Sequence, residues 1–324
     1  MGAAASVVRA LGSGVVAWLA IQTLLFGLVH SAPGGPAAAL SGEFATAETQ
    51  AAVVRSFELD RPVLQQYGAF VARMAQGDWG QSFYFRRSVA GLIGERLGPT
   101  LALMLSALAI AAVTGSALGL WAAAKHRGLA LAAAAAAAIY ALPVFWVGQL
   151  LVQGLGFELR WFPLSGLSDP RQTVGGWRAW LDVGWHAVLP VATLALQQTA
   201  FFVTIVLAKA RAELAQGYVR ALRSRGVAER AILWSHVGRN VAPQVVVAVF
   251  NRVGMLFTGA VLVEILFAWP GLGRLLSSAI LNRDHPVLLG VFALVTAAVI
   301  VSNGVADVLH ARLDPRVGAD REMT

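Results

Sequence analysis

The sequence predicts an all-helical polytopic membrane protein with six transmembrane helices, and its composition and apolar patterning carry that prediction. Of its 324 residues, 57% are hydrophobic and 13% are charged, whereas soluble domains average about 45–50% apolar and about 25% charged residues. A water-soluble protein with so few charges could not cover its own surface with polar groups. The composition therefore disfavours one or two soluble domains.

Six apolar stretches are each long enough to cross a hydrocarbon core about 30 Å thick, which takes about 20 residues of helix. The first stretch is also compatible with a cleaved signal peptide, because Arg9 precedes it and Ser31-Ala32 could serve as a cleavage site. The alanine-rich run at 129–138 and the paired glycines Gly115 and Gly119 predict closely packed helices. The expected spans cover residues 7–29, 100–124, 129–155, 187–208, 243–267 and 286–310.

The net charge of +8 is compatible with nucleic-acid binding and with basic loops between membrane spans. The positions of the charged residues along the chain distinguish these two interpretations. Seven basic and two acidic residues give segment 209–242 a net of +5, and segment 124–128 has a net of +2. The loops 31–99 and 156–186 are balanced. The positive-inside rule therefore places the two basic segments and both termini in the cytoplasm. We expect no nucleic-acid partner.

These spans and loops define the expected organisation of the chain. Residues 1–30 form the first transmembrane helix, and residues 31–99 form an extracytoplasmic loop with a short helix at 63–74. The core transmembrane region covers 100–310 and contains the basic loop 209–242. Residues 311–324 form a cytoplasmic tail.

The sequence lacks the short motifs that hold a nucleotide, a metal ion or a catalytic nucleophile. Its two lysines, Lys125 and Lys209, do not follow a glycine as a P-loop requires. Cysteine is absent, and the six histidines stand singly without metal-ligand spacing. We therefore expect no enzyme activity, cofactor or metal site on this chain. A secondary transporter driven by an ion gradient is another class of membrane protein to consider. Such a transporter predicts paired membrane acids and inverted repeats, which the sequence does not show.

Charged residues in or beside the spans are functional candidates, because burying a charge in lipid costs several kcal/mol. Arg252 lies inside the fifth span beside Asn251, and we expect these two residues to line an aqueous path, or Arg252 to bind a backbone carbonyl. Glu264 and Asp307 lie near span ends. There the interpretation as interfacial, capping or paired residues is favoured.

The basic loop predicts a docking surface for a soluble partner. Helix-forming residues lie on both sides of Gly226, which suits a helix C-cap, so two short amphipathic helices are expected. Apolar residues within the loop, such as Leu222 and Trp234, indicate helix-in-groove docking. A basic interfacial helix against anionic lipid is the alternative.

Residues 218–243 resemble the coupling loop, or EAA loop, of bacterial ABC-importer permeases, in particular the B-type subunit of the dipeptide/oligopeptide/nickel group. The segment 264–274 (Glu-Ile-Leu-Phe-Ala-Trp-Pro-Gly-Leu-Gly-Arg) is similar to a second motif of that subunit. Further similar segments occur in the same order along nearly the whole chain. They are 59–62, 77–82, 96–100, 186–190, 282–286 and 314–316.

The resemblance implies the type I importer, or MetI-like, permease fold, with a path formed at the interface with a second permease. It implies that the coupling loop docks on a cytoplasmic ATPase and that the first span is retained. The implied coupling residues are Tyr218, Arg220, Ala221, Leu222, Arg225, Gly226, His236, Arg239 and Asn240. The implied extracytoplasmic motif residues are Glu264, Trp269, Pro270, Gly271, Gly273 and Arg274.

The resemblance also implies the partners: a C-type permease, two ABC ATPase subunits that hold ATP and Mg²⁺, and an extracytoplasmic solute-binding protein. The location would be the bacterial inner membrane, and the substrates di- or oligopeptides, with nickel or glutathione as alternatives in the same group. Arg220 stands where the motif's glutamate would stand, and Gly226 lies seventeen residues before Pro243, one fewer than is usual for the group. The match is loose over 209–217.

Overall fold

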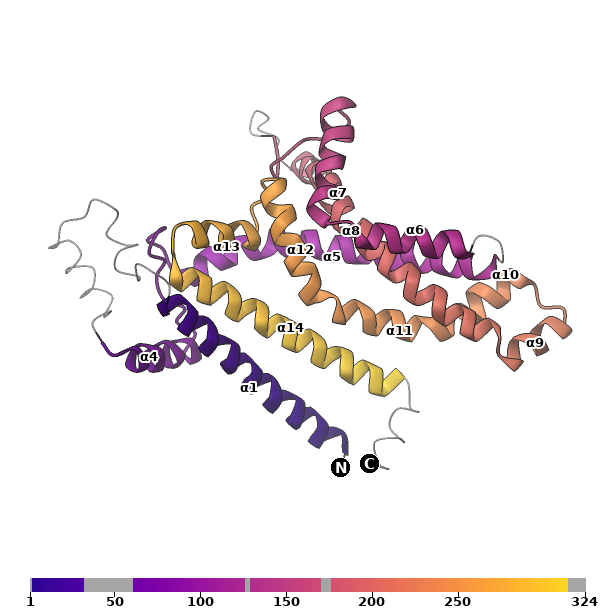
Figure 1. Cartoon of the computed structure of the whole chain (residues 1–324), viewed down its shortest axis with the longest axis horizontal. Coiled ribbons are helices and arrows are strands. Elements are labelled where there is room, and N and C mark those ends of the chain that lie inside the picture. The colour runs from indigo at the N-terminus through magenta and orange to yellow at the C-terminus, as the bar shows by residue number, and fades with distance from the viewer. Residues whose placement is uncertain (1, 32–60, 126–128, 170–175, 314–324) are drawn as a thin grey trace. The chain divides into compact units, whose positions relative to one another are not determined.

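The computed structural model describes residues 2–31, 61–125, 129–169 and 176–313, and these are helical almost throughout (Figure 1). The prediction of an all-helical protein is confirmed. The chain forms two compact units, one of residues 1–100 and 270–301 and the other of residues 101–269 and 302–324. Helices α5 (Val89–Ala124) and α14 (His285–Leu313) each continue from one unit into the other.

Within the described residues, four helices are long and apolar enough to cross a membrane, and there are six spans if each of two bent helix pairs counts as one. The number six therefore agrees with the prediction, but the third and fifth spans are not straight. The four helices are Gly12–Ser31 within α1 (Gly2–Ser31), α5, α8 (Trp177–Leu214) and His285–His310 within α14. The bent pairs are Ala133–Ala141 with Val144–Glu158, at 95°, and Glu229–Asn251 with Val253–Leu266, at 53°.

The bend in the third span lies between α6 (Leu129–Ala141) and α7 (Val144–Leu151), which continues as the π-helical segment η1 (Val152–Glu158). Pro143 lies in this break in an extended conformation, with φ −61° and ψ 131°. Proline has no backbone N–H and disfavours helical geometry in the preceding residue. The expectation of one continuous helix was therefore wrong for a local reason that the sequence contains.

The bend in the fifth span lies between α11 (Gly238–Asn251) and α12 (Val253–Leu266), and no proline causes it. Arg252 sits at the bend with φ −85° and ψ −8°. Its N–H is shared between the carbonyls of Ala248, at 3.1 Å, and Val249, at 3.3 Å. The side chain of Arg252 makes a long-range contact at this bend, to a residue 54 positions earlier in the chain.

In the second unit, α5 and α8 cross at the predicted glycine pair. A Cβ added at Gly115 would lie 2.5 Å from Cβ of Phe202, and one added at Gly119 would lie 2.9 Å from Cβ of Val206. The alanine-rich helix α6 packs on α8 through Ala136, which is buried. Both predictions of close packing are confirmed.

The first unit holds α1, α4 (Val63–Ala75), α13 (Leu272–Leu281) and the adjoining parts of α5 and α14. The helix expected at 63–74 is confirmed as α4. Trp18 of α1 donates its indole N–H to the carbonyl of Ala293 in α14, at 3.0 Å. The end of α1 packs on α4 through an aromatic contact between Phe26 and Tyr67, with ring centroids 5.3 Å apart.

Candidate functional site

The turn at Gly226 has the geometry of a Schellman cap at the end of α9 (Gly217–Ser224). Gly226 has φ +75°, its N–H donates to Arg223 O at 3.0 Å, and the N–H of Val227 donates to Leu222 O at 3.1 Å. These are the two backbone bonds that define the motif. Glycine adopts this positive φ without steric cost, so the predicted C-cap role of Gly226 is confirmed.

The second short helix expected in the loop is not a separate element. The α10 turn (Glu229–Ala231) runs directly into the π-helical segment η2 (Ile232–Val237) and then into α11. Gly238, the only glycine in this stretch, is helical with φ −57° and ψ −40°, so it does not interrupt the helix. The prediction was wrong because the apolar side chains of η2 are buried in the core, which favours continuing the helix.

Helix α9 has one buried face and one exposed face. Val219 is fully buried, and Tyr218 and Leu222 are half-buried. This face packs on an apolar cluster formed by the neighbouring ends of α5, α8 and η2–α11: Leu120, Ala122, Ala123, Val206, Leu207, Ala210, Ile232, Leu233, Val237 and Val241. Displacement of α9 would therefore press on three helices at once.

The exposed face of α9 is basic. Arg220, Arg223 and Arg225 are exposed, and so is Ala221. Arg223 donates to Glu229 through Nε at 2.6 Å and Nη2 at 3.1 Å, which ties α9 to α10 across the glycine turn. Arg220 and Arg225 therefore supply the positive charge of this face that is not engaged by Glu229.

Tyr218 and Asn240, two predicted coupling residues, meet on Glu213 at the end of α8. The Tyr218 hydroxyl donates to Glu213 Oε2 at 3.1 Å, and Asn240 Nδ2 lies 3.2 Å from the same oxygen and 3.1 Å from the hydroxyl. Lys209 Nζ lies 3.6 Å from Glu213 Oε1. Burial, and then the Glu213 carboxylate, raise the pKa of Tyr218, so its hydroxyl stays protonated and donates. Glu213 was not among the predicted site residues, although its i, i+4 spacing from Lys209 was a usable signal.

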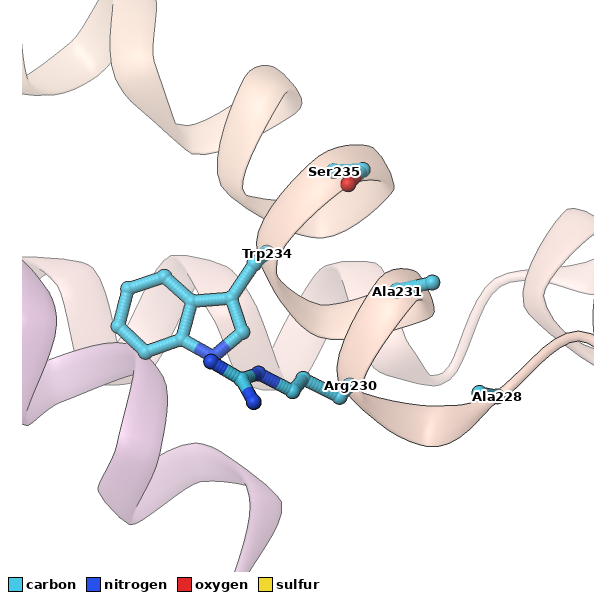
Figure 2. Close-up of a pocket in the computed structure, with 5 residues that line it drawn as sticks. All are labelled: Ala228, Arg230, Ala231, Trp234 and Ser235. Carbon is cyan, nitrogen blue, oxygen red and sulfur yellow. The ribbon is translucent and has the colours of Figure 1, made fainter.

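An open pocket of about 630 Å³ lies beside α10 and η2, lined by Ala228, Arg230, Ala231, Trp234 and Ser235 (Figure 2). Trp234 is 45% exposed, so its ring offers apolar surface next to the basic face. His236 of η2 and Arg239 of α11, which are predicted coupling residues, are also exposed.

Arg252 is buried at the bend rather than open to a path. Its Nε donates to Gln198 Oε1 at 2.8 Å, and both side chains are buried. The guanidinium carbon lies 3.9 Å from the ring centroid of Phe201 and 5.8 Å from that of Tyr140. Arg252 thus donates to the side-chain amide oxygen of Gln198, where a backbone carbonyl was the expected acceptor. Gln198 was missed, although a polar residue in an apolar span is a recognised signal.

Asn251, adjacent to Arg252, is exposed and lines a groove of about 540 Å³ within the second unit. The groove lies between α8, α11 and the end of α14, and Lys209, Asn240, Gln244 and His310 are its other polar lining residues. Of the two residues expected to line a path, the structure thus places Asn251 on an open groove and Arg252 behind it.

The motif 264–274 is largely buried. In the second unit, Glu264 and Trp269 are buried, and the Trp269 N–H donates to Glu264 O at 2.8 Å. The first unit contains 270–274, where Gly271 and Gly273 are buried, Pro270 is half-buried and Arg274 is exposed. Asp307, the other acid considered at a span end, is exposed.

Two of the matching segments, 77–82 and 282–286, meet within the first unit. Asp284 is fully buried and accepts from the Ser82 hydroxyl and from the N–H groups of Phe83, at 3.1 Å, and Tyr84, at 3.2 Å. Asp284 thereby fixes the turn after segment 77–82. Segment 314–316 and residues 59–60 lie outside the described residues.

Comparison with known families decides the identity of the chain. Residues 115–319 match the binding-protein-dependent transport system inner membrane component, and residues 5–104 match the N-terminal part of such membrane components. The chain belongs to this family. It is a multi-pass inner-membrane permease subunit of an ABC importer of the peptide group, with the type I fold expected from the resemblance.

Relatives of the permease cover nearly its whole length. A peptide permease protein of Brucella ovis is 32% identical over 304 residues, which are 92% of this chain and 94% of the relative. The glutathione transport system permease protein of Escherichia coli is 33% identical over 299 residues, covering 92% and 93%. A peptide ABC transporter permease protein of Sinorhizobium fredii is 28% identical over 313 residues, covering 96% and 98%.

Proposed function

We propose that this permease imports di- or oligopeptides, together with a C-type permease, two cytoplasmic ABC ATPase subunits and an extracytoplasmic solute-binding protein. The names of the relatives, peptide permease and glutathione transport permease, support a substrate with peptide bonds. ATP and Mg²⁺ are held by the ATPase subunits, and this chain converts their motion into opening and closing of the path.

The observation that carries the proposal is the two-faced helix α9. Its basic face, including Arg220, Ala221 and Arg225, is exposed and free to enter a cleft of the ATPase. Its apolar face rests on the ends of α5, α8 and η2–α11. ATP-driven movement of the cleft is thereby passed to three helices of the core. His236 and Arg239 extend the same docking surface.

The proposed topology places α9 and both termini in the cytoplasm, with 31–99 outside and 311–324 as a cytoplasmic tail. The concentration of positive charge in 209–242 supports this orientation. We propose that α1 is retained as residues 1–30 of the mature protein. The hydrogen bond from Trp18 to Ala293 and the family match over 5–104 support a structural role for α1.

The proposed path runs along the groove lined by Asn251, with Arg252 supporting its wall. Residues 100–310 form the core that surrounds this half of the path. We propose that the motif residues Glu264, Trp269, Pro270, Gly271, Gly273 and Arg274 face the extracytoplasmic side of the membrane.

Replacement of Gly226 tests the coupling role. In the importer reconstituted with its partners, Gly226→Trp is expected to abolish peptide uptake while ATP hydrolysis continues, because a bulky side chain at φ +75° both strains the turn and obstructs docking. Gly226→Asn is the matched control, since asparagine tolerates the same conformation. Uptake that persists in Gly226→Trp at the rate of the asparagine variant contradicts the docking proposal, and wild-type uptake without nucleotide contradicts the importer proposal.

A further inference from the structure

We propose that a stripe of carboxamides on α11 binds the backbone of an extended peptide as it passes through the permease, an inference that rests on the proposed function in peptide import. The stripe consists of Asn240, Gln244 and Asn251, which are all exposed and line the groove of about 540 Å³. That volume falls within the range of about 300–1,000 Å³ typical of small-molecule sites.

The spacing of the three carboxamides places them on one face of α11. At 3.6 residues per turn, positions 240, 244 and 251 fall within about 40° of arc. Asn251 lies eleven positions after Asn240, which corresponds to about 16 Å of helix, a length that about four or five residues of extended peptide would match at about 3.3–3.6 Å each. The stripe is thus long enough to follow a short peptide lengthwise.

Carboxamides suit a peptide backbone because each can both donate and accept a hydrogen bond, as the backbone does. The side chains of Gln244 and Asn251 have no hydrogen-bond partner among the described residues, and Asn240 uses its Nδ2 on Glu213 and Tyr218 but keeps Oδ1 available. Polar groups on a membrane span are costly against lipid. Exposed carboxamides on α11 therefore favour a wet, ligand-facing groove.

The opposite wall of the groove is apolar, and the charges beside the groove are nearly balanced. Phe201 and Ile205 of α8 face the groove one turn apart and can accept varied substrate side chains without requiring a polar partner. Lys209 and His310 also line the groove, and Glu213 lies 3.6 Å from Lys209 and 3.2 Å from Asn240. Recognition through the backbone with little charge preference would allow one path to serve peptides of different sequence.

The absence of cysteine from the chain makes the stripe directly testable. Gln244→Cys and Asn251→Cys are labelled with a water-soluble thiol reagent in the assembled importer in lipid nanodiscs, with labelling read by mass spectrometry of this subunit. A tetrapeptide and its backbone N-methylated counterpart, which carry the same side chains, are the probes. Val246→Cys, also on α11 but outside the groove lining, is the control.

We expect both groove cysteines to be labelled and the tetrapeptide to slow this labelling, whereas the N-methylated peptide should have little effect on it. Neither peptide should change the labelling rate of Val246→Cys. Gln244→Leu and Asn251→Leu should each raise the KM for peptide uptake by about twofold to tenfold, the value of one hydrogen bond. Absent labelling, labelling that peptide does not slow, or equal protection by both peptides would overturn the inference. Wild-type ATP-dependent peptide uptake by the same importer reconstituted in proteoliposomes shows separately whether the proposed function holds.

Discussion

Alanine at Gly115 should destabilise the permease although alanine favours helices. An added Cβ would lie 2.5 Å from Cβ of Phe202 and 2.8 Å from the backbone carbonyl oxygen of Thr199. Unstrained carbon contacts lie at about 3.5–4.0 Å. Since one of the crowded atoms belongs to the backbone of α8, a rotamer change cannot relieve the contact, and α5 and α8 must separate.

The size of the effect follows from a matched pair of substitutions in α5. Gly94→Ala adds the same atom where no other atom lies within 4 Å, so it should gain up to about 1 kcal/mol of helix propensity. Gly115→Ala gains the same helix propensity, but overpacking at the crossing typically lowers the free energy of unfolding by about 1–3 kcal/mol. The difference between the two variants isolates the crossing and should be about 1–3 kcal/mol.

The assay is unfolding of the purified permease in mixed micelles with increasing sodium dodecyl sulfate, followed by far-ultraviolet circular dichroism. Gly115→Ala should unfold at a lower detergent fraction than Gly94→Ala. If Gly115→Ala proves equally stable or more stable, the close α5–α8 crossing deduced from the glycine pair is refuted.

Three further predictions concern the buried polar contacts and the topology. Gln198→Leu leaves the buried Arg252 guanidinium without its amide partner and should cost about 1.5–3 kcal/mol in the same unfolding assay; unchanged stability would contradict the role of this contact. Asp284→Ala removes the acceptor of three donors in the turn at Ser82–Tyr84, so limited proteolysis should cut the segment 77–88 faster than in wild type, and unchanged cleavage would contradict the role of the carboxylate. Alkaline phosphatase should be inactive when fused at Thr324 and active when inserted near Gly80, and exported activity at Thr324 would contradict the proposed orientation.

Local sequence signals predicted much of the fold correctly. The apolar runs located the spans because length and hydropathy suffice for that purpose. The glycine pair 115/119 predicted a helix crossing, and Gly226 predicted a helix end, because both depend on what a missing Cβ permits. Pro143 was a local signal for the bend of the third span. It was not used because it lies within the long apolar run 129–155, which was interpreted as one span.

Features that depend on distant partners could not be read from the sequence. The 53° bend at Arg252 has no local breaker, and Gln198, the partner of that arginine, lies 54 residues earlier. Asp284 meets Ser82 across 202 residues. The groove combines positions from α8, α11 and α14, so Gln244 had no local feature that set it apart from other polar residues.

The central claim is that the basic face of α9 contacts an ATPase rather than lipid. A benzophenone amino acid placed at Ala221, which is exposed, is irradiated in the assembled importer in its membrane. The same group at Leu64 of α4, which is 81% exposed, serves as the control, because the proposed topology places α4 on the other side of the membrane. Crosslinking of position 221 to the ATPase subunit, with none from position 64, is the predicted result. Crosslinking of position 221 to lipid alone would contradict the proposed coupling.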